Sequence, residues 1–371
     1  MVQNIFAIVG TRPEAVKMAP VIEALRRREV HDVRIVSTGQ HHELLRQTFW
    51  TFGIKPDIEL GVMQPGQSLA ELTSRLMVAI DPLLERHAPA MVIAQGDTTS
   101  VMVAALLSFY RHIPFAHVEA GLRTGDIHSP FPEEFNRIVA GRLAALHFAP
   151  TRRAADNLMA EGISRDMIHV TGNTVIDALL KIAARGGSPP VPVRTGRRLI
   201  LVTCHRRENF GAPLGHIFSA LKRLLIAHPD CEIVFPVHPN PAVRTLAFRQ
   251  LGGNARIHLV DPLSYEDLVA TMQASFMVMT DSGGIQEEAP SLRKPVLVLR
   301  QSTERPEAVE AGVAEIAGTD EDVIFEKANR LLYDPLHYAR MATGANPYGD
   351  GHAATRIADL IDIFLDRRTQ A

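Results

Sequence analysis

Short apolar runs alternate with helical patterns along the whole chain, and this alternation limits the possible folds more than any other feature. The runs cover residues 5–9, 33–37, 91–94 and 115–118 in the first half, and residues 199–202, 233–236, 257–260, 276–279 and 296–299 in the second. Strands that are buried on both faces form such continuous runs, and strands that alternate with helices pair in parallel. The sequence therefore predicts an α/β fold with doubly wound parallel sheets.

A glycine- and proline-rich segment at residues 186–192 interrupts this pattern near the middle of the chain. The 371 residues are enough for two domains that each bury a core. We therefore expect an N-terminal Rossmann-like domain over residues 1–185 and a C-terminal Rossmann-like domain over residues 186–352. An amphipathic helix over residues 353–371 follows a turn-rich stretch, and we expect it to pack back on the first domain.

Composition excludes several classes of function. Hydrophobic residues make up 46% and charged residues 22% of the chain, and a net charge of −2 offers no field that would attract nucleic acid or a membrane. The N-terminal residues pass directly into a strand, no apolar run reaches membrane-spanning length, and the two cysteines lie in apolar surroundings. We therefore expect a cytoplasmic protein without disulfides.

Residues 280–290 join an apolar run to a short helix that is expected to stop at Pro290. Ser282, Gly283 and Gly284 lie on the turn, where a helix N-terminus offers N–H donors and glycine lets the backbone approach a ligand. This pattern predicts a diphosphate site, although many such turns carry two glycines for conformational reasons alone. Glu287 and Glu288 are expected on the first helical turn, within reach of sugar hydroxyls.

Three carboxylates, Asp97, Glu119 and Glu133, fall at strand ends or in the loop beside them. In a doubly wound sheet such positions converge on one crevice. Asp97 could instead cap the following helix, although Thr98 or Thr99 would serve equally well. Glu133 and Arg137 have the spacing of an i,i+4 ion pair.

Basic side chains occupy related positions. Arg12 and Lys17 flank the start of the first helix, with Pro13 at its favoured first position, and are either anion contacts or surface charges. His205 and His238 follow strands of the second half, and two histidines at equivalent strand ends favour a functional role more than a lone histidine, which is more often structural, would do. Their spacing does not fit a metal pair, no Cys/His cluster exists, and the first strand–helix turn lacks G-x-G-x-x-G, so we expect no metal site and no dinucleotide fingerprint.

Taken together, these motifs show that the chain resembles the non-hydrolysing UDP-N-acetylglucosamine 2-epimerases. The matching motifs run in order along nearly the whole chain: Gly10-Thr11-Arg12-Pro13-Glu14, Gly96-Asp97-Thr98-Thr99, His117-Val118-Glu119-Ala120-Gly121-Leu122-Arg123, Pro132-Glu133-Glu134, His205-Arg206-Arg207-Glu208-Asn209, Asp281-Ser282-Gly283-Gly284, Glu304-Arg305-Pro306 and Asn346-Pro347-Tyr348-Gly349. The resemblance implies two Rossmann-like domains facing each other across a cleft, the glycosyltransferase-B architecture. It implies interconversion of UDP-GlcNAc and UDP-ManNAc for surface polysaccharide, without metal or nicotinamide, and we expect a homodimer.

The resemblance also implies roles for the matching residues. The expected reaction is anti-elimination of UDP to 2-acetamidoglucal followed by re-addition, because the C2 proton is not acidic in the intact substrate. The expected catalytic residues are Asp97, Glu119, Glu133 and His205, and which carboxylate removes and which returns the proton is left open. The expected UDP-sugar contacts are Arg12, Lys17, Arg137, Arg206, Ser282, Gly283, Gly284, Glu288 and Arg305. An allosteric UDP-GlcNAc would use Gln40, His41, Gln67 and His238, together with Arg206.

Three other functions share parts of this pattern. A UDP-2,3-diacetamido-glucuronate 2-epimerase of the same family would carry the same phosphate and carboxylate motifs. A glycosyltransferase on the same scaffold would need an acceptor site and would leave the C2 hydrogen in place. A non-catalytic nucleotide-sugar sensor would be expected to lose one of the three carboxylates, all of which this chain retains.

Overall fold

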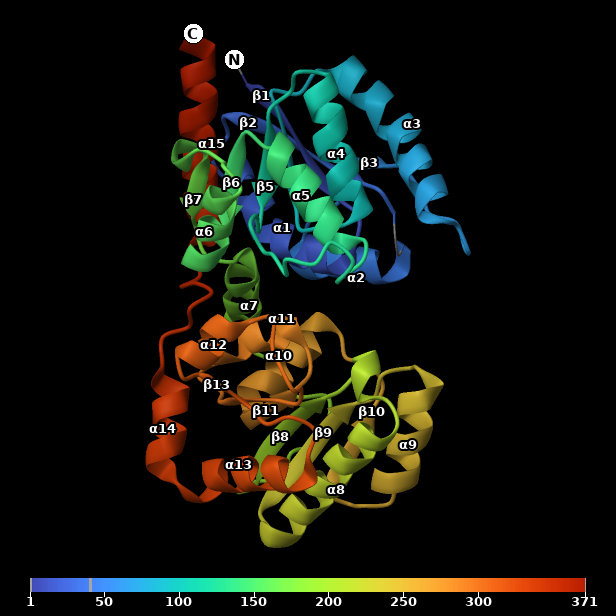
Figure 1. Cartoon of the computed structure of the whole chain (residues 1–371), viewed down its shortest axis with the longest axis vertical. Coiled ribbons are helices and arrows are strands. Elements are labelled where there is room, and N and C mark those ends of the chain that lie inside the picture. The colour runs from blue at the N-terminus through green and yellow to red at the C-terminus, as the bar shows by residue number, and fades with distance from the viewer. Residues whose placement is uncertain (1, 40–41, 371) are drawn as a thin grey trace. The chain divides into compact units, whose positions relative to one another are not determined.

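The computed structural model describes residues 2–39 and 42–370. These residues form two compact units, Met1–Ala178 with Tyr348–Ala371 and Leu179–Pro347 (Figure 1). Each unit contains its own parallel sheet and its own hydrophobic core. The boundary expected between residues 185 and 186 stays a prediction.

The part of the first unit that the structure describes contains a seven-stranded parallel sheet. Its strands are β1 (Gln3–Val9), β2 (His31–Ser37), β3 (Ile58–Glu59), β4 (Met91–Gln95), β5 (Phe115–Val118), β6 (Leu146–Ala149) and β7 (Ile168–Val170). The order across the sheet is β3-β2-β1-β4-β5-β6-β7, so the winding reverses between β1 and β4. Ligands of doubly wound sheets bind outside the carboxyl ends of the strands at such a switch point.

Helices cover both faces of this sheet. The helices of the unit are α1 (Arg12–Arg26), α2 (His42–Phe52), α3 (Leu69–His87), α4 (Thr99–Tyr110), α5 (Glu133–Leu143), α6 (Arg152–Ala160), the start of α7 (Thr174–Ala184) and α15 (Ala353–Gln370), with a 3₁₀ turn η1 (Arg165–Met167). Alternate residues of each strand face opposite cores, as the period of two requires. Ile5 and Ile93 pack with α1, α2 and α15, whereas Phe6 and Val92 pack with α3, α4 and α5.

Two helix starts test the sequence rules for caps. Helix α3 begins after Ser68, whose hydroxyl accepts from Glu71 N while the Glu71 carboxylate accepts from Ser68 N. Both halves of a capping box are therefore present at this helix start. Helix α1 begins at Arg12, so Pro13 is its second residue and not its first, because Thr11 serves as the cap.

The second unit repeats the architecture with a six-stranded parallel sheet among its described residues. Its strands are β8 (Arg198–Thr203), β9 (Cys231–Pro236), β10 (Ile257–Val260), β11 (Ser275–Thr280), β12 (Val296–Val298) and β13 (Ala314–Ile316), in the order β10-β9-β8-β11-β12-β13. Its helices are α8 (Ala212–Ala227), α9 (Pro241–Leu251), α10 (Tyr265–Ala274), α11 (Gly283–Glu288), α12 (Pro306–Glu310), α13 (Glu321–Tyr333) and α14 (Pro335–Thr343), with 3₁₀ turns η2 (Arg207–Asn209) and η3 (Ala289–Leu292). The winding reverses between β8 and β11. Helices α8, α9 and α13 bury one face of the sheet.

The predicted fold class, an α/β chain with two doubly wound parallel sheets, is confirmed. Every strand expected from an apolar run is present, and the described residues contain four more strands, β3, β6, β7 and β13, that were not predicted. Among the described residues, no helix combines the length and the hydropathy that crossing a membrane would require.

Candidate active site

Glu119 lies at the carboxyl end of β5 and is the most enclosed of the three predicted carboxylates. Glu119 is 8% exposed. Its φ is +62°, a left-handed conformation that residues other than glycine rarely adopt. Lys17 Nζ lies 2.7 Å from both carboxylate oxygens. Gln95 Nε2 donates to Oε2, and Asn173 Nδ2 donates to Oε1 at 3.2 Å. The structure therefore brings the predicted residues Lys17 and Glu119 together and adds two amides that the sequence did not identify.

Asp97 follows the neighbouring strand β4 and pairs with Arg137. Arg137 Nε and Nη2 donate to Asp97 Oδ2 at 2.9 and 2.7 Å. Thr98 caps α4, so Asp97 does not fill that role. Burial acts to lower the pKa of Arg137, but the charges and hydrogen bonds of Asp97 and Glu134 raise it overall, which keeps the guanidinium charged beside both carboxylates.

Glu133 and Glu134 begin α5 but have different environments. Glu134 is buried, and its carboxylate accepts from Thr124 N at 3.0 Å, Gly125 N at 3.2 Å and Arg137 Nη1 at 3.0 Å. The i,i+4 pair that the spacing of Glu133 and Arg137 permitted is therefore not the one formed, because Arg137 turns toward Glu134 and Asp97. Glu133 is half-buried, and no hydrogen bond within the described residues fixes its carboxylate.

Glu14 is a buried acid to which the sequence assigned no role beyond its place in the motif Gly10-Thr11-Arg12-Pro13-Glu14. It is 3% exposed, and its Oε2 accepts from Thr11 N at 3.0 Å and from Gly10 N. Burial raises the pKa of Glu14 to about 7, with Asp97 adding to the effect and the hydrogen bonds from Thr98, Gly10 and Thr11 opposing it. The carboxyl anchors the turn from which Arg12, the first residue of α1, projects.

Asp281 organises the charged residues at the switch point of the second sheet. It is fully buried, and its carboxylate accepts from His205 N, from Arg206 N at 2.9 Å and from Asn209 Nδ2 at 2.9 Å. His205 Nδ1 lies 3.1 Å from Asp281 Oδ1. Burial acts to raise the pKa of Asp281, but His205 and the N–H donors lower it overall, so the group is held as a carboxylate. Asp281 thereby fixes the backbone of the predicted residues His205 and Arg206.

The two predicted histidines lie together. The rings of His205 and His238 stack with centroids 6.2 Å apart and planes inclined by 25°. Burial lowers the pKa of His238, and the neighbouring His205 lowers it further. His205 remains 40% exposed at its side chain, which leaves its ring accessible to a ligand.

Ser282 lies between β11 and α11, as predicted, but Gly283 and Gly284 are the first two residues of α11 and do not belong to the turn. Ser282 N donates to Thr280 Oγ1 at 2.9 Å, and the Ser282 hydroxyl does not cap the helix. A Cβ on Gly283 would lie 3.7 Å from Arg206 Nη2, so the predicted residues Gly283 and Arg206 are neighbours. Arg206 Nη2 also lies 3.7 Å from Glu304 Oε2.

The two glutamates of α11 were expected on its first turn, and this expectation is wrong. They are the last two residues of the helix, because it begins at Gly283, and η3 then carries the chain past Pro290. Glu288 is 5% exposed and accepts from Tyr265 Oη at 2.7 Å. Glu287 is buried and accepts from Arg305 Nε. The predicted residues Glu288 and Arg305 are thus both held by partners that the sequence did not indicate.

The residues predicted for an allosteric site are only partly described. Gln67 lies in the loop before α3, where its Oε1 accepts from Gln64 N at 3.1 Å and from Arg75 Nη1 at 3.2 Å. His238 belongs to the second unit and stacks on His205. Gln40 and His41 lie outside the described residues.

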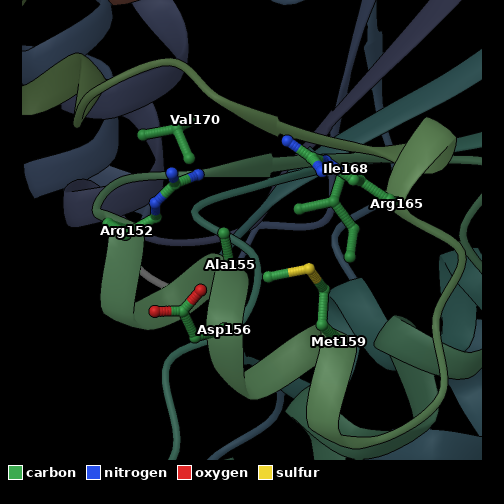
Figure 2. Close-up of a pocket in the computed structure, with 7 residues that line it drawn as sticks. All are labelled: Arg152, Ala155, Asp156, Met159, Arg165, Ile168 and Val170. Atoms are coloured by element: carbon green, nitrogen blue, oxygen red, sulfur yellow. The ribbon is translucent and has the colours of Figure 1, made fainter.

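A pocket of about 240 Å³ lies elsewhere in the first unit, and none of the predicted site residues lines it. Figure 2 shows Arg152, Asp156 and Met159 on α6 facing Ile168 and Val170 on β7. Over residues 2–39 and 42–370, no group of three or more His, Cys, Asp or Glu could hold a metal ion.

The first unit thus gathers carboxylates with lysine and arginine partners at the carboxyl ends of its strands, and the second gathers histidine and arginine around a buried aspartate at its switch point, an arrangement typical of doubly wound α/β enzymes. The family model of UDP-N-acetylglucosamine 2-epimerase matches residues 23–362. The UDP-N-acetylglucosamine 2-epimerase of Bacillus subtilis is 48% identical over 96% of this chain and 94% of its own length, and that of Escherichia coli K12 is 45% identical over 96% and 98%. The crystal structure of UDP-GlcNAc 2-epimerase from Neisseria meningitidis bound to UDP-GlcNAc has a TM-score of 0.89 and 40% identity, covering 97% of this chain and 100% of that one.

The chain therefore belongs to the UDP-N-acetylglucosamine 2-epimerase family. The resemblance predicted from the ordered sequence motifs is confirmed.

Proposed function

We propose that this chain reversibly interconverts UDP-GlcNAc and UDP-ManNAc by inverting the configuration at C2. The observation that carries the proposal is the Glu119 carboxylate, which is buried at the carboxyl end of β5, one strand from the switch point, and is held by Lys17, Gln95 and Asn173. Two relatives that are 48% and 45% identical to this chain are named UDP-N-acetylglucosamine 2-epimerase.

The first step is elimination. The bond from C1 to the diphosphate oxygen breaks and its electron pair leaves with UDP. Positive charge at C1 makes the C2 proton removable, and one carboxylate takes that proton to give 2-acetamidoglucal. We assign this proton transfer to the carboxylate set of Asp97, Glu119 and Glu133, since a positioned acid or base accelerates such transfers by about 10²–10⁴.

The second step reverses these changes on the other face of C2. A second acid of the same set returns a proton to C2 from the opposite face while the diphosphate oxygen re-forms the bond to C1. Two carboxylates on opposite faces are needed because one group cannot serve both. The distinct environments of Glu119 and Glu133, one enclosed by three donors and one half-buried, support a division of labour between them.

The second unit supplies the residues that we assign to UDP. Glu288 binds the ribose hydroxyls, and Arg305, Arg206 and the Ser282–Gly283–Gly284 segment at the start of α11 bind the diphosphate. His205 stabilises the charge that develops on the leaving oxygen, since donors aimed at developing charge contribute the largest single term in many enzymes. Arg12, Lys17 and Arg137 complete the cationic set.

Heavy water provides the test of this proposal. We expect UDP-GlcNAc incubated with the enzyme in D₂O to gain deuterium at C2 in both epimers, detected by mass spectrometry and NMR. A product without deuterium at C2 would contradict proton exchange and would favour glycosyl transfer. A parallel incubation with UDP-2,3-diacetamido-glucuronate distinguishes the two substrates within the family.

Assembly and regulation are part of the same proposal. We propose a cytoplasmic homodimer that supplies ManNAc-type sugars to surface polysaccharide. A second UDP-GlcNAc acts as an activator through Gln40, His41, Gln67, Arg206 and His238. Sedimentation velocity tests the dimer, and a sigmoidal dependence of rate on UDP-GlcNAc that Gln67→Ala abolishes tests the activation.

A further inference from the structure

The chain leaves the first unit after Ala178 and returns to it at Tyr348, and the segments on either side of these crossings meet inside the first unit. We name residues 171–177 and 348–356 the junction. Asn173 N donates to Tyr348 O at 2.6 Å. A Cβ on Gly172 would lie 3.3 Å from Gly349 Cα, so the two backbones approach each other directly.

Side chains also hold the junction together. Asp177 accepts from Ala353 N at 3.2 Å and from Ala354 N at 2.9 Å, at the start of α15. Arg356 Nη1 donates to Thr171 O at 3.0 Å. The outgoing and returning segments are therefore tied at several points, and a displacement of one requires a displacement of the other.

Asn173 connects this junction to the candidate active site. Its residue is 2% exposed, and both ends of its amide are used. Oδ1 accepts from Val175 N at 3.1 Å, near the start of α7, while Nδ2 donates to Glu119 Oε1 at 3.2 Å. One residue thus bonds the returning segment through its backbone and the enclosed carboxylate through its side chain.

We infer that Asn173 is a positioning residue that orients the Glu119 carboxylate and makes its orientation depend on the geometry of the junction. The inference rests on the proposed function. An amide N–H donated to a carboxylate stabilises the ionised form and restricts its rotation. Lys17 on α1 donates to the Glu119 carboxylate, and the buried His117 on β5 is electrostatically coupled to it.

The Asn173→Asp variant tests the side-chain contact. It keeps an oxygen for Val175 N but directs a second carboxylate at Glu119, which raises the pKa of Glu119. We expect kcat to fall about ten- to a hundredfold, with a smaller change in KM. We expect the midpoint of the kcat–pH profile that reports the ionisation of Glu119 to shift to higher pH by about one unit.

Asn157→Asp is the matched control. Asn157 Nδ2 donates to the backbone oxygen of Gly121 at 2.9 Å, two residues after Glu119 in the sequence. Its side-chain bond therefore goes to the backbone and not to a carboxylate. We expect Asn157→Asp to leave both limbs of the profile unmoved. Equal effects of the two variants, or an Asn173→Asp enzyme with wild-type kcat and profile, would overturn the inference. A wild-type enzyme that exchanges no deuterium at C2 would overturn the proposed function itself, and the inference with it.

A double-mutant cycle tests the link to the junction. Gly349 has a φ of +140°, which is strained for any residue with a side chain, and a Cβ there would contact Asn173 N at 3.4 Å, so we expect Gly349→Ala to shift the backbone that Asn173 contacts. We expect Gly349→Ala to lower kcat in the wild-type background and to add little in the Asn173→Asp background, with UDP affinity unchanged in both. Multiplicative effects in the cycle would show that the junction does not act through Asn173. If Gly349→Ala does not fold, Asp177→Asn replaces it in the same cycle.

Discussion

Asp97 and Glu119 are neutralised by different cations, a guanidinium and an ammonium, and this difference separates their chemistry. Arg137 binds Asp97 through two nitrogens, whereas Lys17 places a single Nζ between the two oxygens of Glu119. A guanidinium stays charged under all physiological conditions, while an ammonium gives up its proton more readily when buried. In the proposed mechanism we therefore expect proton transfer at C2 to involve Glu119 more readily than Asp97.

Asp97→Asn tests whether that residue serves chemistry or binding. We expect turnover to fall by about 10²–10⁴, because an amide accepts no proton, while the affinity for UDP stays close to wild type. Steady-state kinetics and calorimetric titration with UDP measure the two quantities. Asp81→Asn is the control. Asp81 lies on α3 and also accepts two hydrogen bonds from one arginine, Arg111, at 2.8 and 2.7 Å. A chiefly weakened UDP affinity in Asp97→Asn would contradict the assigned role.

The reaction intermediate distinguishes the glutamates from His205. We expect Glu119→Gln or Glu133→Gln to slow epimerisation and to release 2-acetamidoglucal with UDP, because elimination outruns the return of the proton. We expect His205→Ala to slow the first step by about 3–4 kcal/mol of transition-state stabilisation and to accumulate no glucal. Mass spectrometry of the reaction mixture decides between them. Residual epimerisation in both glutamine variants without any glucal would argue that the C1–O bond never breaks.

Glu14 predicts a pH dependence of stability with a definite sign. The pKa of Glu14 is raised from 4.5 to about 7 in the folded protein, so between these values the folded state holds a proton that the unfolded state has lost. Its contribution is complete below pH 4.5 and is lost as the pH rises to about 7, a total of about 3 kcal/mol. Glu14→Gln lacks this titration, so we expect its stability relative to wild type to rise by that amount over the same window. Urea unfolding at a series of pH values measures the difference, and parallel curves for the two proteins would refute it.

At the scale of the element, the sequence predicted strands by their apolar runs and missed those without one. Strands β3, β7 and β13 span two or three residues and are partly exposed, so they contain no continuous apolar run. Strand β6 is buried and includes His147, as β5 includes His117, but its four residues were not recognised as an apolar run. Each of these strands is ordered by pairing with a neighbour, and such pairing is not encoded locally.

The sequence predicted where the candidate site residues lie in the fold, but it did not predict their hydrogen-bond partners. Strand ends and glycine turns identified Asp97, Glu119 and the Ser282 turn because the architecture fixes where strand ends lie. Sequence spacing could not choose between Glu133 and Glu134 as the partner of Arg137, since i,i+3 and i,i+4 neighbours both lie on the same face of a helix. The donors to Glu119 come from three separate segments, and only the fold brings them together.

Helix α15 offers a test of packing at this scale. Ile361 is fully buried in the core that α15 shares with α1 and β1, whereas Ile363 on the same helix is 48% exposed. We expect Ile361→Ala to lower the free energy of unfolding by about 2–5 kcal/mol and Ile363→Ala by less than about 0.5 kcal/mol. Thermal and urea unfolding compare the two. Equal losses would show that α15 does not complete this core.

At the scale of the whole molecule, each unit has a separate task in the proposed mechanism, and ligand binding can separate them. We expect UDP to stabilise the protein by about 2.7 kcal/mol at a concentration of 100 Kd, and Glu288→Ala and Arg305→Ala to reduce UDP affinity about ten- to a hundredfold. Thermal shift with a UDP titration measures both. Glu133→Gln, a substitution in the other unit, is the control that retains the full shift. A lost shift in Glu133→Gln would contradict this division of tasks.

The place of α15 in the core of the first unit has a consequence for synthesis on the ribosome. Ile357, Ile361 and Leu365 belong to the same core as Ile5 and Ile22, yet they are translated after the whole of the second unit. Domains otherwise tend to fold from the N-terminus as the chain emerges. The first unit therefore waits with the apolar face of α1 uncovered until translation reaches the last helix, and this nascent state is where a chaperone has its longest opportunity to bind.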